Sequence, residues 1–169
     1  EISECLVGSE MCIRDRDMDE HMMGMLDLRI AGIHSLCYQP GTVEENTYGM
    51  MQAISNPYTH IISHPGDGTA QLDFEPIVLA AKAHHTLLEI NNSSLKPCRK
   101  KLEAKDNNLE ILRLCKRYEV PVILGSDAHI SFDIATYEYV LPLLAETDFP
   151  EDLVMNTSVE RLKAYLHIK

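Results

Sequence analysis

The sequence predicts an α/β fold in which helices cover a parallel β-sheet. Short apolar segments of strand type alternate with longer segments of helical periodicity, and the connections between them are short. The composition is that of a globular protein, with 45% hydrophobic and 24% charged residues, and 169 residues suffice for one domain. About four strand–helix units are present, too few to close an eight-stranded barrel. The sheet is therefore open, or it is part of a barrel.

The predicted strands are short and apolar, and turn residues bound them. The first alternates apolar and polar residues, whereas the later ones are more continuously apolar. The predicted strands cover residues 26–32, 60–63, 86–91 and 121–125.

The predicted helices lie between these strands and after the last one. Thr42 and Glu45 form a capping box that begins the first helix, and Asp73 is placed to cap the second. Asn107 or Asn108 is predicted to cap the third. Two further helices are predicted over residues 136–145, with Pro142 as a kink, and over residues 158–167.

Composition excludes several classes of function. The formal net charge is −11, and the lysines and arginines do not cluster strongly, so we expect no nucleic-acid partner. No apolar run is long enough to cross a membrane, and we expect no membrane partner. The five cysteines are irregularly spaced, which indicates reduced thiols and a cytoplasmic protein.

The segment 1–16 shows neither helical nor strand periodicity. We interpret it as a non-native or disordered leader without function, and we assign residues 17–169 to a single domain.

Three predicted strands end in residues that commonly bind metals. His34 and His64 each follow one strand, and Asp127 and His129 follow the last. The carboxyl ends of parallel strands meet on one face, so these side chains should converge there. Asp127 and His129 would stand roughly 6.5–7 Å apart, a separation that suits two neighbouring ions better than one. Imidazole and carboxylate ligands favour zinc, manganese or iron.

The remaining sequence favours a hydrolytic metal site. No nucleophile elbow and no phosphate-binding loop signature occurs, so a metal-bound hydroxide is the expected nucleophile. Asn92, Ser93, Arg99 and Lys100 lie in the loop after the third strand and could bind phosphate, although an ordinary solvated basic loop explains them equally well. Glu89 is interpreted as structural rather than catalytic.

Four motifs, LDLRIAGIHSLCY, THIISHPG, LLEINNSS and VILGSDAH, resemble in order and spacing the PHP (polymerase and histidinol phosphatase) superfamily, and most of all its YcdX-like zinc phosphatases. The resemblance implies a distorted seven-stranded (βα) barrel with a site for three zinc ions, and residues 17–169 would form the C-terminal part of that barrel. It implies that His34 and His64 bind one ion, Asp127 a second and His129 a third. Family members also begin with an H-x-H strand and supply a bridging glutamate, which this chain lacks, so its activity should be impaired.

The resemblance implies a metal-dependent phosphatase that acts on a small phosphorylated substrate. Zinc is the expected cofactor, with manganese or iron as alternatives. Two other functions fit the same motifs: a non-catalytic PHP module with a structural or interaction role, and a metal-dependent amidohydrolase.

Overall fold

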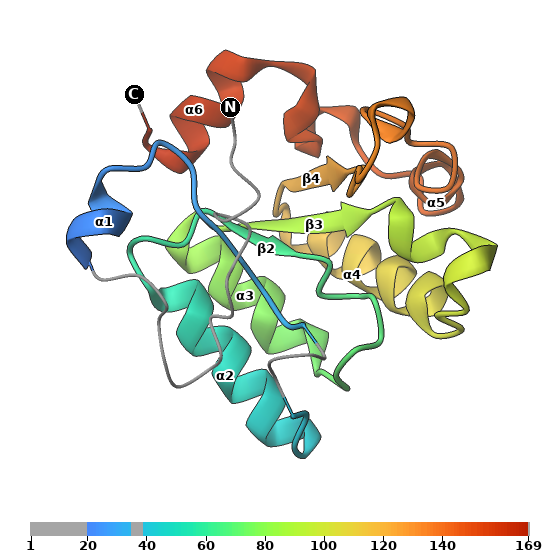
Figure 1. Ribbon diagram of the computed structural model, residues 1–169, viewed down its shortest axis with the longest axis horizontal. Helices are drawn as coiled ribbons and strands as arrows, with labels where there is room; N and C mark the ends of the chain where they lie inside the picture. Colours follow the sequence, from blue (N-terminus) through green and yellow to red (C-terminus); the bar gives the residue numbers. More distant parts are fainter. Residues whose placement is uncertain (1–19, 35–38, 169) are drawn as a thin grey trace.

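The computed structural model describes residues 20–34 and 39–168 and has the predicted α/β architecture. The leader predicted over residues 1–16, and the domain boundary predicted at its end, lie outside the described residues. One sheet forms the centre of the molecule, and helices flank it (Figure 1).

The sheet has four strands in the order β1-β2-β3-β4, and every neighbouring pair is parallel. The strands are β1 (Ile30–Gly32), β2 (Ile61–Ser63), β3 (Leu87–Asn91) and β4 (Val122–Gly125). The first strand begins four residues later than predicted. Directly before the strand, the backbone N–H of Arg29 donates to the His60 ring at 3.2 Å, while the Arg29 carbonyl accepts from the N–H of Ile61 in β2 at 3.2 Å.

Six α-helices accompany the sheet in the described part of the chain. They are α1 (Glu20–Gly24), α2 (Val43–Ser55), α3 (Phe74–His84), α4 (Ala104–Tyr118), α5 (Leu141–Glu146) and α6 (Val159–Leu166). Short 3₁₀ turns occur at Ser93–Leu95, Pro97–Arg99, Ser131–Asp133, Glu151–Leu153 and Met155–Thr157. None of the described helices is both long and apolar enough to cross a membrane.

Two of the predicted helix starts are confirmed. Thr42 and Glu45 form the capping box of α2: the Glu45 N–H donates to Thr42 Oγ1 at 3.3 Å, and the Thr42 N–H donates to Glu45 Oε2 at 2.9 Å. Asp73 caps α3, where its side chain accepts from the backbone N–H of Glu75 at 3.3 Å.

Two helix predictions were wrong. The helix α4 begins at Ala104 rather than at Asn107 or Asn108. Asn108 therefore lies inside the helix, where its side-chain amide donates to the Ala104 carbonyl at 2.7 Å. The helix α5 begins at Leu141, five residues later than predicted, so Pro142 lies in its first turn. Backbone N–H groups in the first turn have no partner within the helix, so the missing N–H of Pro142 costs nothing there and the helix is not kinked.

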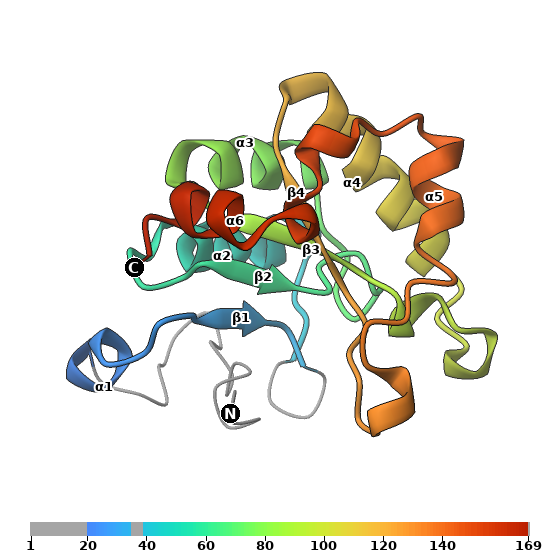
Figure 2. The same cartoon turned by 90° about the horizontal axis from the view of Figure 1, so that it is seen from above.

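The two faces of the sheet are covered differently. The helices α2, α3 and α4 lie along one face, and α6 lies across the other (Figures 1 and 2). Strand residues alternate between these faces. The buried residues Ile62, Leu88 and Val122 pack in the cluster that includes residues of α2, α3 and α4, whereas Ile61 and Leu87 pack with residues of α6.

On the α6 face, polarity changes along the strands. Ile61 and Leu87 are paired in register near the amino ends of their strands, and they contact the α6 cluster. Two residues further along each strand stand Ser63 and Glu89, and Asn91 follows at the end of β3. The carboxyl-terminal half of this face therefore carries polar side chains, a pattern that indicates a site at this edge of the sheet.

At the opposite end of the sheet, Arg29 and His60 form a contact that should make stability depend on pH. The guanidinium of Arg29 lies 2.7 Å from His60 Nε2, and its NH1 donates to the carbonyls of Met23 and Leu26 at 2.8 Å each. Burial, with the charge of Arg29 adding to it, lowers the pKa of His60 to about 4.

The unfolded chain, in which the pKa of His60 is about 6.5, therefore binds a proton between about pH 6.5 and pH 4 that the folded chain does not. We expect His60 to reduce the free energy of unfolding by about 1–2 kcal/mol over that range, with solvent screening limiting the effect. Urea unfolding of the wild type and of His60→Gln at pH 7 and pH 4.5 measures this contribution. If the free energy of unfolding falls equally in the wild type and in His60→Gln between these pH values, His60 is not the group responsible.

Candidate functional site

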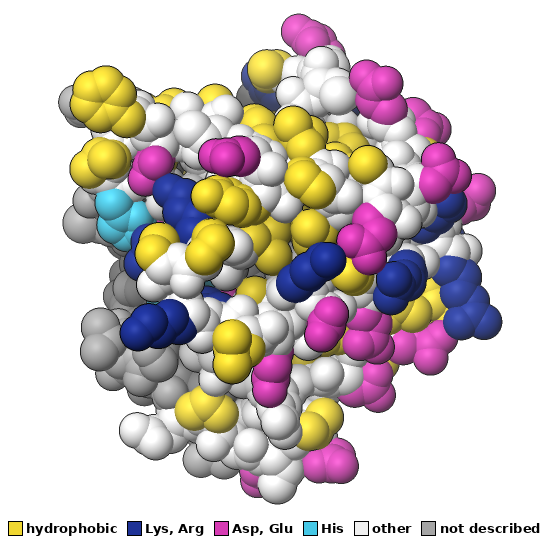
Figure 3. Space-filling model, turned by 90° about the vertical axis from the view of Figure 1, so that its right-hand side faces the viewer, with side chains coloured by type: hydrophobic (Ala, Val, Ile, Leu, Met, Phe, Trp, Pro, Cys, Tyr) yellow, Lys and Arg dark blue, Asp and Glu magenta, His cyan; other side chains and the backbone are white. Residues whose placement is uncertain are grey.

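The four predicted ligands all follow carboxyl ends of strands in the same parallel sheet. His34 lies two residues beyond β1, His64 directly after β2, and Asp127 and His129 two and four residues beyond β4. In Figure 1 the arrows of β3 and β4 point to the right, and Figure 3 views that side of the molecule. Acidic side chains, lysines, arginines, exposed apolar side chains and a histidine all appear on this surface (Figure 3).

The rings of His34 and His64, two of the predicted ligands, lie next to each other. Their ring centroids are 4.9 Å apart, and the ring planes are nearly perpendicular at 83°. Two imidazoles on one tetrahedral zinc ion, with Zn–N distances of about 2.0–2.1 Å, have centroids about 5 Å apart. The spacing of this pair fits a shared metal ion.

Glu89 extends from β3 toward this pair. Its Oε2 accepts from the His64 backbone N–H at 2.7 Å and from Asn91 Nδ2 at 3.2 Å. Burial raises the pKa of Glu89, the charge of His64 opposes this rise, and the negative charge of Asp127 adds to it. Glu89 was interpreted as structural from the sequence, and the period-two alternation that placed it on the face of Asn91 was the signal for its position near the site.

Gly125 makes room for the Glu89 side chain. A Cβ atom on Gly125 would overlap Glu89 Oε1 and would lie 2.5 Å from its Cδ. Since Gly125 pairs with Asn91 at the end of β4, only glycine at this position leaves the carboxylate where it is.

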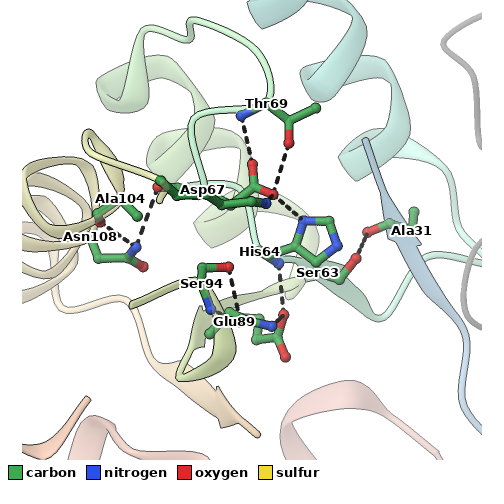
Figure 4. A network of polar contacts seen from close by, with 12 residues as sticks. Ala31, Ser63, His64, Asp67, Thr69, Glu89, Ser94, Ala104 and Asn108 are labelled. Atoms are coloured by element: carbon green, nitrogen blue, oxygen red, sulfur yellow. Dashed lines mark hydrogen bonds and ion pairs between the residues drawn. The ribbon is translucent and has the colours of Figure 1, made fainter. Parts of the chain in front are cut away.

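Asp67 is a buried carboxylate that sequence reasoning missed. Its Oδ2 lies 3.4 Å from His64 Nδ1 (Figure 4). The same oxygen also forms an ion pair with Lys101. Burial by itself would raise the pKa of Asp67, but its contacts with His64 and Lys101 hold that pKa well below the usual range. The sequence offered one signal for this role, which is that Asp67 follows the candidate ligand His64 by three positions.

The contact between Asp67 and His64 has the opposite effect on the pKa of His64, which it raises. Burial lowers the pKa of His64, but the hydrogen bond and charge of Asp67, together with the charge of Glu89, outweigh it and raise the pKa above its ordinary value. Two carboxylates, Asp67 and Glu89, thus lie beside His64, and Lys101 offsets part of the negative charge of Asp67.

The two ligands predicted after β4 lie closer together than expected: His129 Nδ1 is 3.8 Å from Asp127 Oδ1, so the predicted separation of roughly 6.5–7 Å between them was wrong. Asp127 has a left-handed backbone, with φ of 49°, and its charge acts on Glu89. The side chain of His129 is 71% exposed, and its Nδ1 lies 3.0 Å from the Asp127 carbonyl oxygen. In residues 20–34 and 39–168, no three His, Cys, Asp or Glu side chains converge closely enough to hold a metal ion.

The predicted phosphate-binding residues have different environments. An NH2 group of Arg99 donates to Ser93 Oγ at 3.1 Å, so these two side chains stand together. Asn92 is buried, and its Oδ1 accepts from the N–H groups of Tyr139 and Val140 at 2.8 and 3.1 Å, which anchors the segment before α5. Lys100 is exposed in a left-handed conformation at the end of a 3₁₀ turn.

Fold and geometry define the class as an α/β protein with a polar site at the carboxyl edge of a parallel sheet. The chain is 40% identical over 153 residues to a probable phosphatase of Clostridium novyi, a match that covers 90% of this chain and 62% of the relative. It is 41% identical over 152 residues to a probable phosphatase of Caldicellulosiruptor bescii, with the same coverage of each chain.

A probable phosphatase of Thermoanaerobacter sp. (strain X514) is 39% identical over 171 residues, which cover 98% of this chain and 69% of the relative. The chain belongs to the family of these probable phosphatases. It spans 62% of the length of the first two relatives. No protein-family model matches it.

Proposed function

We propose that the protein is a metal-dependent phosphatase of the PHP type, which hydrolyses the phosphoric ester of a small phosphorylated substrate. The observation that carries the proposal is the pairing of His34 with His64 beside the Glu89 carboxylate, in a chain related to probable phosphatases. The proposal assigns the metal site to His34, His64, Asp127 and His129, with Glu89 as an additional carboxylate.

The donor set suits zinc, with manganese or iron as alternatives, because it combines imidazoles with carboxylates. When bound, such ions would supply Lewis acidity that activates water and stabilises charge on the phosphoryl oxygens. Among the chain's own residues, His34 and His64 are spaced to hold one ion together. His129 would have to turn inward from its exposed position to contribute, since its ring now contacts the Asp127 carbonyl.

The loop after β3 is proposed to bind the phosphate. Arg99 and Ser93 already stand together, and Lys100 adds a positive charge at the end of the 3₁₀ turn Pro97–Arg99. Asn92 Nδ2 has no hydrogen-bond partner among the described residues, but it is buried, so it would donate to a ligand oxygen only after the loop moves. The loop thus offers both positive charge and hydrogen-bond donors, which a phosphate group requires.

The sheet is proposed to be part of a PHP-type barrel. Its strands are parallel and adjacent in chain order, and the three helices that connect them, α2, α3 and α4, lie on one face (Figures 1 and 2). Sequential order with right-handed crossovers places connecting helices on the same side, as in (βα) barrels. The carboxyl-terminal half of the opposite face, which carries Glu89, would then point toward the barrel interior, whereas α6 covers the amino-terminal half.

Phosphate release from p-nitrophenyl phosphate by the metal-free chain, before and after addition of zinc or manganese, tests this proposal. We expect slow release that requires metal and stops on chelation, and we expect Asp127→Ala to reduce it at least tenfold. Asp148→Ala is the matched control, because Asp148 is exposed and pairs with Lys116 through an ion pair of 3.0 Å.

Release that persists without metal, or that Asp127→Ala leaves unchanged, would overturn the proposal. Hydrolysis of an amide substrate instead of the phosphate ester would identify a metal-dependent amidohydrolase. Metal binding without hydrolysis of either substrate would identify a non-catalytic module.

A further inference from the structure

We infer that Asp67 is a positioning residue that fixes the tautomer and the direction of the His64 ring. The inference rests on the proposed function, since it assigns to Asp67 the task of presenting His64 Nε2 to a metal ion. None of the four sequence motifs includes Asp67, and the assignment comes from its contacts.

The geometry favours hydrogen on one of the two ring nitrogens. Asp67 Oδ2 lies 3.4 Å from His64 Nδ1. A carboxylate only accepts hydrogen bonds, so an N–H at Nδ1 is attracted to this oxygen, whereas a lone pair at Nδ1 would be repelled by it. The neutral His64 ring then has its lone pair on Nε2, which is turned away from Asp67 on the side where β1 lies (Figure 4).

Asp67 is itself held in place by three donors besides His64. Thr69 donates its backbone N–H to Oδ1 at 2.7 Å and its hydroxyl to Oδ2 at 2.8 Å, and Lys101 pairs with Oδ2. Gly68, with φ of 81°, turns the chain between Asp67 and Thr69 in a conformation that favours glycine. Because the Asp67 side chain is only 5% exposed, these contacts fix it in one position.

This arrangement is the usual support for a metal-binding histidine. Such histidines commonly donate their second ring N–H to a carboxylate, and loss of the carboxylate typically weakens metal binding by about 10- to 100-fold. Lys101 comes from the segment after β3, so the same contact connects that segment to His64. Asp67 thus belongs to the site without contacting the ion.

The experiment is a ¹H–¹⁵N long-range correlation spectrum of the metal-free, ¹⁵N-histidine-labelled protein, recorded at rising pH until the His64 signals no longer change. We expect hydrogen on Nδ1 of His64 in the wild type and loss of that preference in Asp67→Ala. Asp73→Ala is the matched control, because Asp73 caps α3 and its side chain contacts Glu75. It should leave the His64 tautomer unchanged.

Cobalt titration supplies the second readout. Asp67→Ala should weaken Co²⁺ binding at least tenfold, whereas Asp73→Ala should not. Hydrogen on Nε2 in the wild type would overturn the inference whether or not Asp67→Ala folds, and so would equal Co²⁺ affinity in Asp67→Ala and the wild type. Failure of the wild type to bind Co²⁺ would instead overturn the proposed function, while the tautomer would still decide how Asp67 orients His64.

Discussion

Replacing Gly125 by alanine is expected to lower the free energy of unfolding by about 2–4 kcal/mol. The new Cβ would overlap Glu89 Oε1 and would lie 3.0 Å from its Cγ, so the whole side chain of Glu89 would have to move. Its movement would break the 2.7 Å hydrogen bond from the His64 backbone N–H and leave that group unpaired. Urea unfolding at pH 7 measures the loss.

Gly24→Ala is the matched control, because no atom lies within 4 Å of the Cβ that it would add. It should change the free energy of unfolding by no more than about 0.5 kcal/mol. The combination of Gly125→Ala with Glu89→Ala should destabilise less than the sum of the two single changes, since the clash is then absent. Equal effects of Gly125→Ala and Gly24→Ala would show that Glu89 does not occupy the space beside Gly125.

The second large effect concerns metal affinity. His64→Ala is expected to weaken Zn²⁺ or Co²⁺ binding by about 100-fold or more, because it removes one of two imidazoles that share an ion. His34→Ala should have a similar effect, since the two rings are equivalent members of the pair. Competition with a chromophoric chelator measures both affinities.

His84→Ala is the control for these two variants. His84 is exposed at the end of α3 and makes no contribution to the proposed site. An affinity that falls as much in His84→Ala as in His64→Ala would assign the bound metal to surface histidines.

The parallel sheet was predictable because its signal is local and repeated. Each strand is a short apolar run, and the intervening helices carry their own caps, such as Thr42 with Glu45 and Asp73. The alternation of strands and helices then predicted parallel pairing. Parallel pairing in turn placed the carboxyl ends of the strands, and the residues His34, His64 and Asp127 after them, at one edge of the sheet. Period-two alternation likewise placed Glu89 and Asn91 on one face.

The contacts that shape the site were not predictable in the same way. The role of Asp67 depends on Lys101, 34 residues away, and on a turn at Gly68 that brings Thr69 back to the carboxylate. The exposed position of His129 depends on the left-handed backbone at Asp127, whereas the prediction assumed an extended strand. A contact distant in sequence decides the first and a local backbone conformation the second, and no periodic pattern in the sequence encodes either.

The helix starts show the same limit. Asn108 has the side chain of a capping residue, but its amide donates within α4 to Ala104 and toward the Gly66 carbonyl at 3.4 Å. Tertiary contact with the loop after β2 thus overrides the capping preference of asparagine. Pro142 belongs to the first turn of α5 because the preceding residues form turns instead of a helix.

The most direct test of the central claim is a crystal structure of the zinc-loaded protein with anomalous data at the zinc edge. The account predicts an anomalous peak between the imidazole rings of His34 and His64, about 2.0–2.1 Å from one nitrogen of each. Zinc found only at other histidines, such as His84 or His167, or no peak beside His64 at full zinc occupancy, would contradict it.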